Sequence, residues 1–151
     1  MADVVNRETR SRVMSAVRSK NTKLELDVRR RLYAQGFRYR LHRKGLPGTP
    51  DMVFAKYRAV VFVHGCFWHY HRCHLSKLPG TRQSWWKQKL EANKARDAKV
   101  VSELQKLGWR VMTVWECSIR KPRADRKSVL DDVTRAVDEF LKSETVLAEI
   151  P

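Results

Sequence analysis

Several features that would place this chain in a membrane or outside the cell are missing from its sequence. It contains no run of about 18 apolar residues, the length that a bilayer-spanning helix needs. Residues 1–10 lack the apolar core of a secretion signal. The cysteine count, three, is low and odd, which argues against a disulfide framework. We therefore expect a cytoplasmic protein with no membrane segment and with free thiols.

Acidic residues are also scarce. The chain has 16 Asp and Glu against 32 Lys and Arg, which gives a net charge of +16. Such an excess indicates a polyanionic partner, most often nucleic acid, although a generally basic, solvated surface is the alternative. With 151 residues the chain is long enough for one domain with a real core. We expect 1–20 to be a basic arm on DNA, or else a frayed terminus, and 21–151 to be that domain.

The spacing of apolar residues and the residues that begin or end helices together predict the secondary structure. Thr22 with Glu25 three residues later forms a capping box, and Gly36 ends the helix that it opens. Ser128 is expected to cap the last helix. Between them the pattern predicts a short strand at 37–41, a hairpin of 51–55 with 59–63, a long helix at 83–107 and a strand at 109–115. The order helix, hairpin, helix, strand, helix is typical of a mixed α/β sandwich.

Residues 60–74 hold four of the five histidines and two of the three cysteines. Cys66, His71 and Cys73 fall within eight residues, and Cys117 follows a later apolar run. Three thiolates and one imidazole suit a tetrahedral zinc ion. Zinc would use every cysteine, and its removal would destabilise the fold. The alternative is a set of buried free thiols with surface histidines around them.

Asp51 stands between Pro50 and the apolar residues of a predicted strand, and the strand expected to pair with it ends at His64. A carboxylate beside the end of a second strand is a common arrangement for a magnesium site that hydrolyses phosphodiesters. Imidazoles nearby act as acid or base near neutral pH. A turn or cap role for Asp51 is the alternative.

Four longer segments together resemble the very-short-patch-repair (Vsr) DNA mismatch endonucleases: P-G-T-P-D-M-V-F, V-F-V-H-G-C-F-W-H-Y-H-R-C, N-K-A-R-D and L-G-W-R-V-M-T-V-W-E-C. The resemblance covers about residues 3 to 120. It implies an α/β fold of the restriction-endonuclease, PD-(D/E)xK-like type: a mixed sheet flanked by helices, with a structural zinc site. Members nick one strand 5′ to the T of a T:G mismatch, which arises when 5-methylcytosine deaminates, and they use magnesium.

The resemblance also implies roles for single residues. Asp51 corresponds to the magnesium-binding carboxylate, with the backbone carbonyl of Val63, where many members have Thr, as a second ligand. His69 corresponds to the general base and Asp97 to its partner, although in R-D-A-K alone Asp97 would pass for a surface ion pair. Further residues implied at the catalytic site are Glu25, as an outer-sphere ligand in addition to its capping role, and His64, which contacts phosphate.

For the remaining residues the resemblance assigns Cys66, His71, Cys73 and Cys117 to zinc, in agreement with their spacing. Aromatic side chains would enter the base stack beside the mismatch, and unstacking is cheapest at a mismatch. The DNA-contacting residues implied are Met14, Phe67, Trp68, Trp86 and, loosely, Lys89, whereas Trp85, Trp109 and Trp115 are expected to pack. Core packing is the alternative for Trp86.

The expected partners are double-stranded DNA with a T:G mismatch and other mismatch-repair proteins, and the expected state is a monomer. Two rival functions are a zinc-braced module that binds mismatches without cutting and a nuclease of the same fold with another target.

Overall fold

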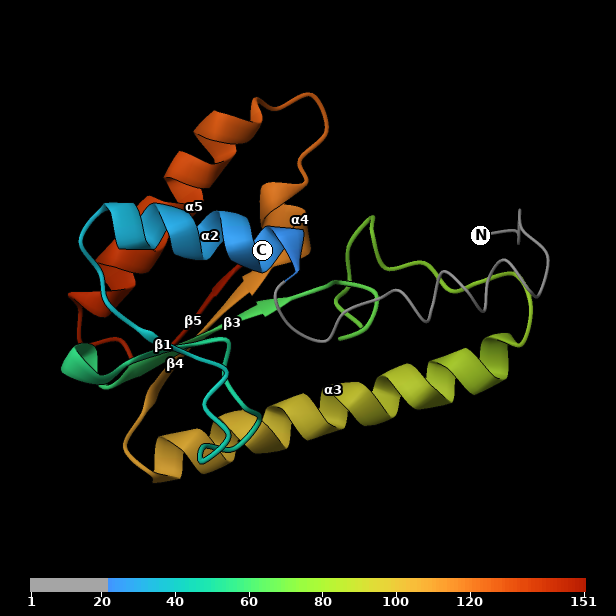
Figure 1. Ribbon diagram of the computed structural model, residues 1–151. Coiled ribbons are helices and arrows are strands. Elements are labelled where there is room, and N and C mark those ends of the chain that lie inside the picture. Colours follow the sequence, from blue (N-terminus) through green and yellow to red (C-terminus); the bar gives the residue numbers. More distant parts are fainter. Residues whose placement is uncertain (1–21) are drawn as a thin grey trace.

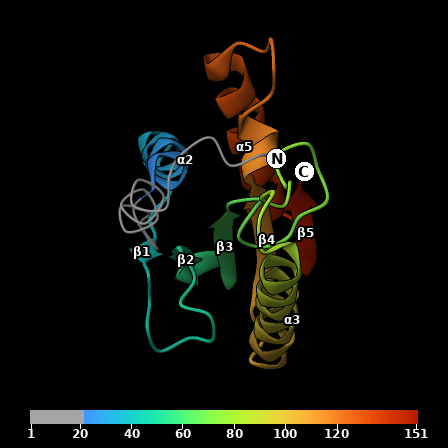
Figure 2. The same cartoon turned by 90° about the vertical axis from the view of Figure 1, so that its right-hand side faces the viewer.

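A five-stranded sheet forms the centre of the computed structural model, which describes residues 22–151 (Figures 1 and 2). The strands lie in chain order: β1 Arg40–Leu41, β2 Met52–Phe54, β3 Ala59–His64, β4 Arg110–Trp115 and β5 Leu147–Ile150. The first three are antiparallel neighbours, and β3, β4 and β5 are parallel. The predicted hairpin and the strand predicted at 109–115 are confirmed. The strand predicted at 37–41 covers only Arg40–Leu41, and β5 was not predicted.

Helices cover both faces of this sheet. The helices α2 (Lys23–Ala34) and α5 (Arg126–Leu141) lie together on one face, and the long helix α3 (Gln83–Lys106) runs along the other (Figure 1). Two short helices, η1 (Ala55–Tyr57) in the hairpin turn and α4 (Glu116–Ile119) after β4, complete the fold. The architecture is the mixed α/β sandwich that the sequence predicts. Among residues 22–151, no helix combines the length and apolarity needed to cross a bilayer.

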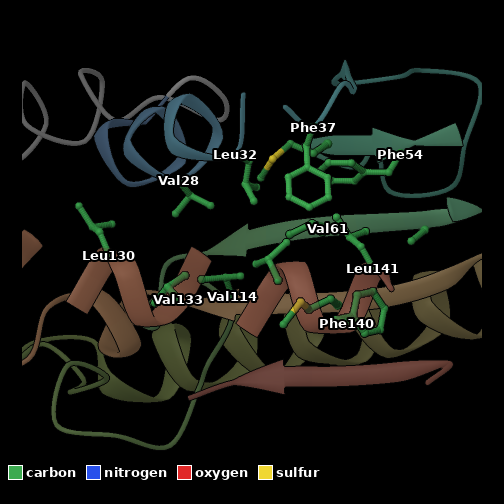
Figure 3. Close-up of a cluster of buried hydrophobic side chains, with 14 of the residues drawn as sticks. Val28, Leu32, Phe37, Phe54, Val61, Val114, Leu130, Val133, Phe140 and Leu141 are labelled. Atoms are coloured by element: carbon green, nitrogen blue, oxygen red, sulfur yellow. The ribbon is translucent and has the colours of Figure 1, made fainter. Parts of the chain in front are cut away.

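Alternating residues of β3 serve two separate cores. Ala59 and Val61 pack under α2 and α5, where Figure 3 shows Val61 among side chains from both helices. Val60 and Phe62 point to the other face, against Leu104 of α3 and its neighbours. A strand buried on both faces reads as a continuous apolar run, which is why 59–63 was recognisable in the sequence.

The helix ends agree with the sequence at α2 and differ at α5. The Thr22 hydroxyl accepts a hydrogen bond from the Glu25 N–H at 3.2 Å, and Gly36 has a φ of +101°, as the predicted cap and stop require. The predicted cap at Ser128 is wrong. The Asp125 carboxylate accepts from the Ser128 N–H at 3.0 Å, so the helix begins three residues earlier than a Ser128 cap would allow.

Two apolar side chains of α3 are not in the core. Trp85 was expected to pack, but 42% of it is exposed, and Leu107 is 54% exposed. Trp85 lies in the first turn of α3, in the half of the helix that extends past the sheet (Figure 1), and Leu107 directly follows the last residue of the helix. The expected packing of Trp109 and Trp115 is confirmed, since each is 8% exposed.

The loop 45–50 packs directly on α3. Gly48 has a φ of +73°, and a Cβ atom at this position would collide with the side chain of Val100. Only glycine combines this backbone conformation with so close an approach. The contact holds the segment that precedes Asp51 against the helix that carries Asp97.

Candidate active site and metal centre

The register of two parallel strands brings the candidate metal ligands together. His64 at the end of β3 lies opposite Trp115 at the end of β4. Cys66 and Cys117 each follow two residues later, so both leave the sheet at the same edge. The Cys117 N–H donates to the Cys66 sulfur at 3.3 Å.

The loop after β3 adds the other two members of this cluster. One ligand atom from each of Cys66, His71, Cys73 and Cys117 lies within 4.8 Å of the other three, and His71 Nδ1 is 3.5 Å from Cys117 Sγ. Sulfur atoms bound to one zinc ion at about 2.3 Å are about 3.8 Å apart, which these positions allow. The thiols are free, and burial raises the pKa of Cys66 and of Cys117. A divalent cation would offset that cost by stabilising the thiolates, so the donor set fits zinc.

A second cluster lies beside the end of β3. His69 Nδ1 is 2.6 Å from the Asp97 carboxylate on α3, and the rings of His64 and His69 stack at 3.7 Å with an interplanar angle of 3°. Asp97 therefore reaches across to the loop after β3. Through this bond it sets the tautomer of His69 and leaves Nε2 as the nitrogen that can accept a proton.

His64 should remain uncharged across the physiological pH range. Burial, followed by the neighbouring His69, lowers its pKa from 6.5 to about 3. The folded state therefore favours the neutral imidazole, and this residue lowers the stability of the fold as pH falls below about 6.5. In a ¹H–¹⁵N NMR titration of the ring nitrogens between pH 5 and pH 8, we expect the signals of His64 to stay constant. A midpoint for His64 near 6.5 would contradict this prediction.

Asp51 is held at the start of the hairpin. The backbone N–H of Val63 donates to Asp51 Oδ2 at 2.7 Å, which places the carboxylate beside the end of β3. Glu25 reaches the same place from α2, with only 2% of its side chain exposed. Its Oε2 accepts from Arg29 at 2.8 Å and lies 2.7 Å from His42 Nε2.

The ionised form of the Asp51 carboxylate is disfavoured because it is buried beside a second carboxylate. Burial raises the pKa of Asp51 from 3.8 to about 7, the Val63 N–H opposes that change, and the charge of Glu25 adds to it. A divalent cation between the two carboxylates would offset both the burial and the repulsion. Hard oxygen donors of this kind fit magnesium.

Asp51 and the cluster of His64, His69 and Asp97 open into one cavity of about 390 Å³. Its lining includes Asp51, Val63, His64, His69 and Asp97. The residues that the sequence suggested for magnesium binding and for proton transfer therefore face a common space. The cavity is wide enough to admit a phosphate group beside them.

Comparisons with known proteins identify the family of this chain. The family model described as DNA mismatch endonuclease Vsr matches residues 2–75. The chain is 42% identical to the DNA mismatch endonuclease Vsr of Escherichia coli over 151 residues, which is 99% of this chain and 94% of that protein. It is also 51% identical to the type II nicking enzyme V.XorIIP of Xanthomonas oryzae over 119 residues, 79% of this chain and 88% of the relative. The chain belongs to the Vsr family.

Three aromatic rings of this Vsr-family chain form a cluster that includes the two residues before His69. The centroids of Phe67 and Trp68 are 5.1 Å apart, and Trp86 lies 5.4 Å from the first and 6.0 Å from the second. Phe67 and Trp68 are half-buried, whereas Trp86 is 9% exposed and packs behind them. Exposed Lys89 lies over the ring of Trp85, and Met14 lies outside the described residues.

Sequence reasoning missed two residues of this Vsr-family site, Asn93 and His42. The Asn93 amide donates to the carbonyl of Trp68 at 3.0 Å, one helical turn before Asp97, so α3 holds the loop at two points. The spacing of four between Asn93 and Asp97 in N-K-A-R-D was a usable signal. His42 sits in R-L-H-R-K, where nothing local distinguishes it, and only the pairing of β1 with β2 brings it to Asp51.

Proposed function

We propose that this protein is a magnesium-dependent endonuclease that nicks one DNA strand 5′ to the T of a T:G mismatch and so initiates very-short-patch repair. One observation carries the proposal. Asp51 and the hydrogen-bonded pair His69 and Asp97 border one cavity in a Vsr-family chain, and Glu25 offers a ligand atom within 4.8 Å of one from Asp51. The Asp51 hairpin on a mixed sheet also supports a PD-(D/E)xK-like fold. We further propose a monomer, because the lesion is not palindromic and only one strand is cut.

The side chains have distinct tasks in this reaction. Asp51 and the Val63 carbonyl would hold magnesium, with Glu25 as an outer-sphere ligand, and the ion would stabilise charge on the phosphate. His69 Nε2 takes a proton from the attacking water, because Asp97 occupies Nδ1 and stabilises the imidazolium that forms. His64 stays neutral and donates a hydrogen bond toward the phosphate. The products carry a 5′-phosphate and a 3′-hydroxyl.

The proposed zinc ion is structural. Four protein ligands leave no position open, so the ion would brace the loop that carries His69 and the aromatic cluster. The net charge of +16 and the exposed lysines of α3 suit contacts with the DNA backbone.

A nicking assay tests the proposed function. End-labelled duplexes with T:G or C:G in varied flanking sequence would be incubated with magnesium or with a chelator. We expect a magnesium-dependent nick only at T:G. Tight T:G binding without a nick would instead support a binding module, and equal cutting of both duplexes would indicate a nuclease with another target.

His69→Ala should slow nicking by about 10²- to 10⁴-fold, the usual contribution of a general base. Asp97→Asn should give a smaller loss, because the asparagine keeps a hydrogen-bonding group near Nδ1 but no longer stabilises the charged ring. Single-turnover rates measured from pH 5 to pH 9 would check both values. His74→Ala, which changes an exposed histidine of the same loop, serves as the matched control. An unchanged pH–rate profile for His69→Ala would count against its role as base.

Trp68→Ala should weaken discrimination between T:G and C:G duplexes more than it weakens total binding. An aromatic side chain in the base stack gains most where the pair is already weakened. Fluorescence anisotropy with both duplexes would measure the ratio of the two Kd values. Tyr33→Ala removes an aromatic side chain that is 54% exposed on α2 and serves as the control. Equal losses on both duplexes would mean that Trp68 only packs.

A further inference from the structure

His42 occupies a position that neither the sequence analysis nor the proposed mechanism uses. Leu41 pairs with Met52 in the β1–β2 ladder, and the next residue, His42, donates its N–H to the carbonyl of Asp51 at 3.3 Å. The backbone of His42 has a φ of +47°, a left-handed conformation that non-glycine residues adopt at a cost. Its side chain is 13% exposed and lines the cavity. The fold therefore holds an imidazole beside the two carboxylates.

The two carboxylate oxygens of Asp51 have different neighbours. Oδ2 accepts from the Val63 N–H, so Oδ1 is the oxygen left for a cation. His42 Nε2 lies 3.9 Å from Oδ1, which is too far for a hydrogen bond. Two ligand atoms that bind one ion at about 2.1 Å are about 3.0 to 4.2 Å apart, so this separation suits a shared cation.

Glu25 is placed differently. Its Oε2 is 2.7 Å from His42 Nε2, closer than two neighbouring octahedral ligands at this radius would be. The carboxylate of Glu25 therefore fits a place outside the inner ligand pair. The contact at 2.7 Å is a hydrogen bond in which the Nε2–H donates to Oε2. When Nε2 binds a cation, the ring proton resides on Nδ1 and Glu25 Oε2 moves away from Nε2 while it keeps its bond to Arg29.

We propose that His42 Nε2 is a nitrogen ligand of the cation held by Asp51 and that this site selects a first-row transition cation, such as Mn²⁺, over Mg²⁺. The inference rests on the proposed nuclease function, which magnesium supports, and adds one ligand to the same cation site. Carboxylates and water suit both ions, whereas an imidazole raises affinity for transition metals far more than for magnesium. Glu25, His42 and Asp51 each offer one ligand atom, and these atoms lie within 4.8 Å of one another.

The competing role for His42 is to orient Glu25 by a hydrogen bond. Two substitutions separate the roles. His42→Gln retains an N–H donor that can reach Glu25 but removes the imidazole, whereas His42→Ala removes both. A ligand role predicts that the two variants lose Mn²⁺ equally, and an orienting role predicts that His42→Gln behaves like the wild type. His74→Gln makes the same change at an exposed position and is the matched control.

The experiment measures metal binding without turnover. Zinc-loaded protein would be titrated with Mn²⁺ by electron paramagnetic resonance, which counts free Mn²⁺, and with Mg²⁺ by calorimetry. We expect the wild type and His74→Gln to bind Mn²⁺ more tightly than Mg²⁺. His42→Gln and His42→Ala should each lose about tenfold or more in Mn²⁺ affinity with little change for Mg²⁺.

Two results would overturn the inference: unchanged Mn²⁺ affinity in His42→Gln, or a wild type that does not favour Mn²⁺. Either result would leave the nuclease function intact if the wild type still nicks T:G with magnesium. Conversely, a protein that binds Mn²⁺ through His42 but nicks no duplex would retain the metal site and refute the proposed reaction.

Discussion

Asp51→Asn abolishes nicking in magnesium but leaves binding to T:G duplexes within about threefold of wild type, if the proposed assignment is right. Asparagine has nearly the same shape and can still accept from the Val63 N–H, so the hairpin is retained. It cannot supply the anionic oxygen that a hard divalent cation prefers. The loss should exceed the roughly 10²- to 10⁴-fold expected for a general base alone.

Asp132→Asn is the matched control, because its carboxylate is 65% exposed on α5 and lies outside the candidate site. Single-turnover nicking and fluorescence anisotropy should be measured on the same preparations. A fully active Asp51→Asn would refute the metal-binding assignment. A variant that loses mismatch binding together with nicking would show that Asp51 shapes the DNA-binding surface as well.

The same substitution should stabilise the fold. The pKa of Asp51 is raised from 3.8 to about 7, so the folded state resists ionising this carboxylate and loses stability as pH rises from about 4 to 7. A difference of about three in pKa corresponds to on the order of 4 kcal/mol in the free energy of unfolding. Urea unfolding without magnesium should show Asp51→Asn more stable at pH 8, with a gain that shrinks toward pH 4. A variant less stable than wild type at pH 8 would contradict this prediction.

His71→Ala should cost the protein its zinc and a large part of its stability. The binding free energy of a structural zinc ion is also folding free energy, about 10 kcal/mol or more in small zinc domains, and domains are stable by only about 5 to 15 kcal/mol. We expect one zinc per wild-type chain, released to a colorimetric chelator on denaturation, and much less from the variant. Its Tm should fall by about 10 °C or more.

His74→Ala provides the comparison, because His74 is an exposed histidine three residues later in the same loop. It should retain both zinc and Tm. Wild-type protein that releases no zinc would support the alternative of buried free thiols. Equal effects of the two substitutions would mean that the loop, and not the ligand, determines stability.

Sequence patterns predicted those parts of the molecule whose causes are local or whose residue types are distinctive. The doubly buried strand 59–63, the capped helix after Thr22 and the Cys and His spacing belong to this group. β5 was missed because L-A-E-I is short and half-exposed at the edge of the sheet, so it has no continuous apolar run. Asp125 was passed over for Ser128 because both are good caps and local sequence does not rank them.

The residues whose positions were not predicted from the sequence are those whose placement depends on tertiary contacts. Trp85 was expected to pack, but α3 extends beyond the sheet at that point and 42% of the residue is exposed. His42 became interpretable only through the ladder of β1 with β2, a contact between residues that no periodicity links. The roles of Asp51 and Asp97 came from resemblance, since single carboxylates occur in many turns and helix surfaces.

The shared register of β3 and β4 has a consequence for how the chain can vary in length. Cys66 and Cys117 meet because each follows its strand end by two residues. One extra residue inside either strand would turn the following side chains to the opposite face and separate the two thiols. The exposed loop 120–125 is under no such constraint. Insertions, affinity tags or a fused domain therefore belong in that loop, while the two strands must keep their lengths to the residue.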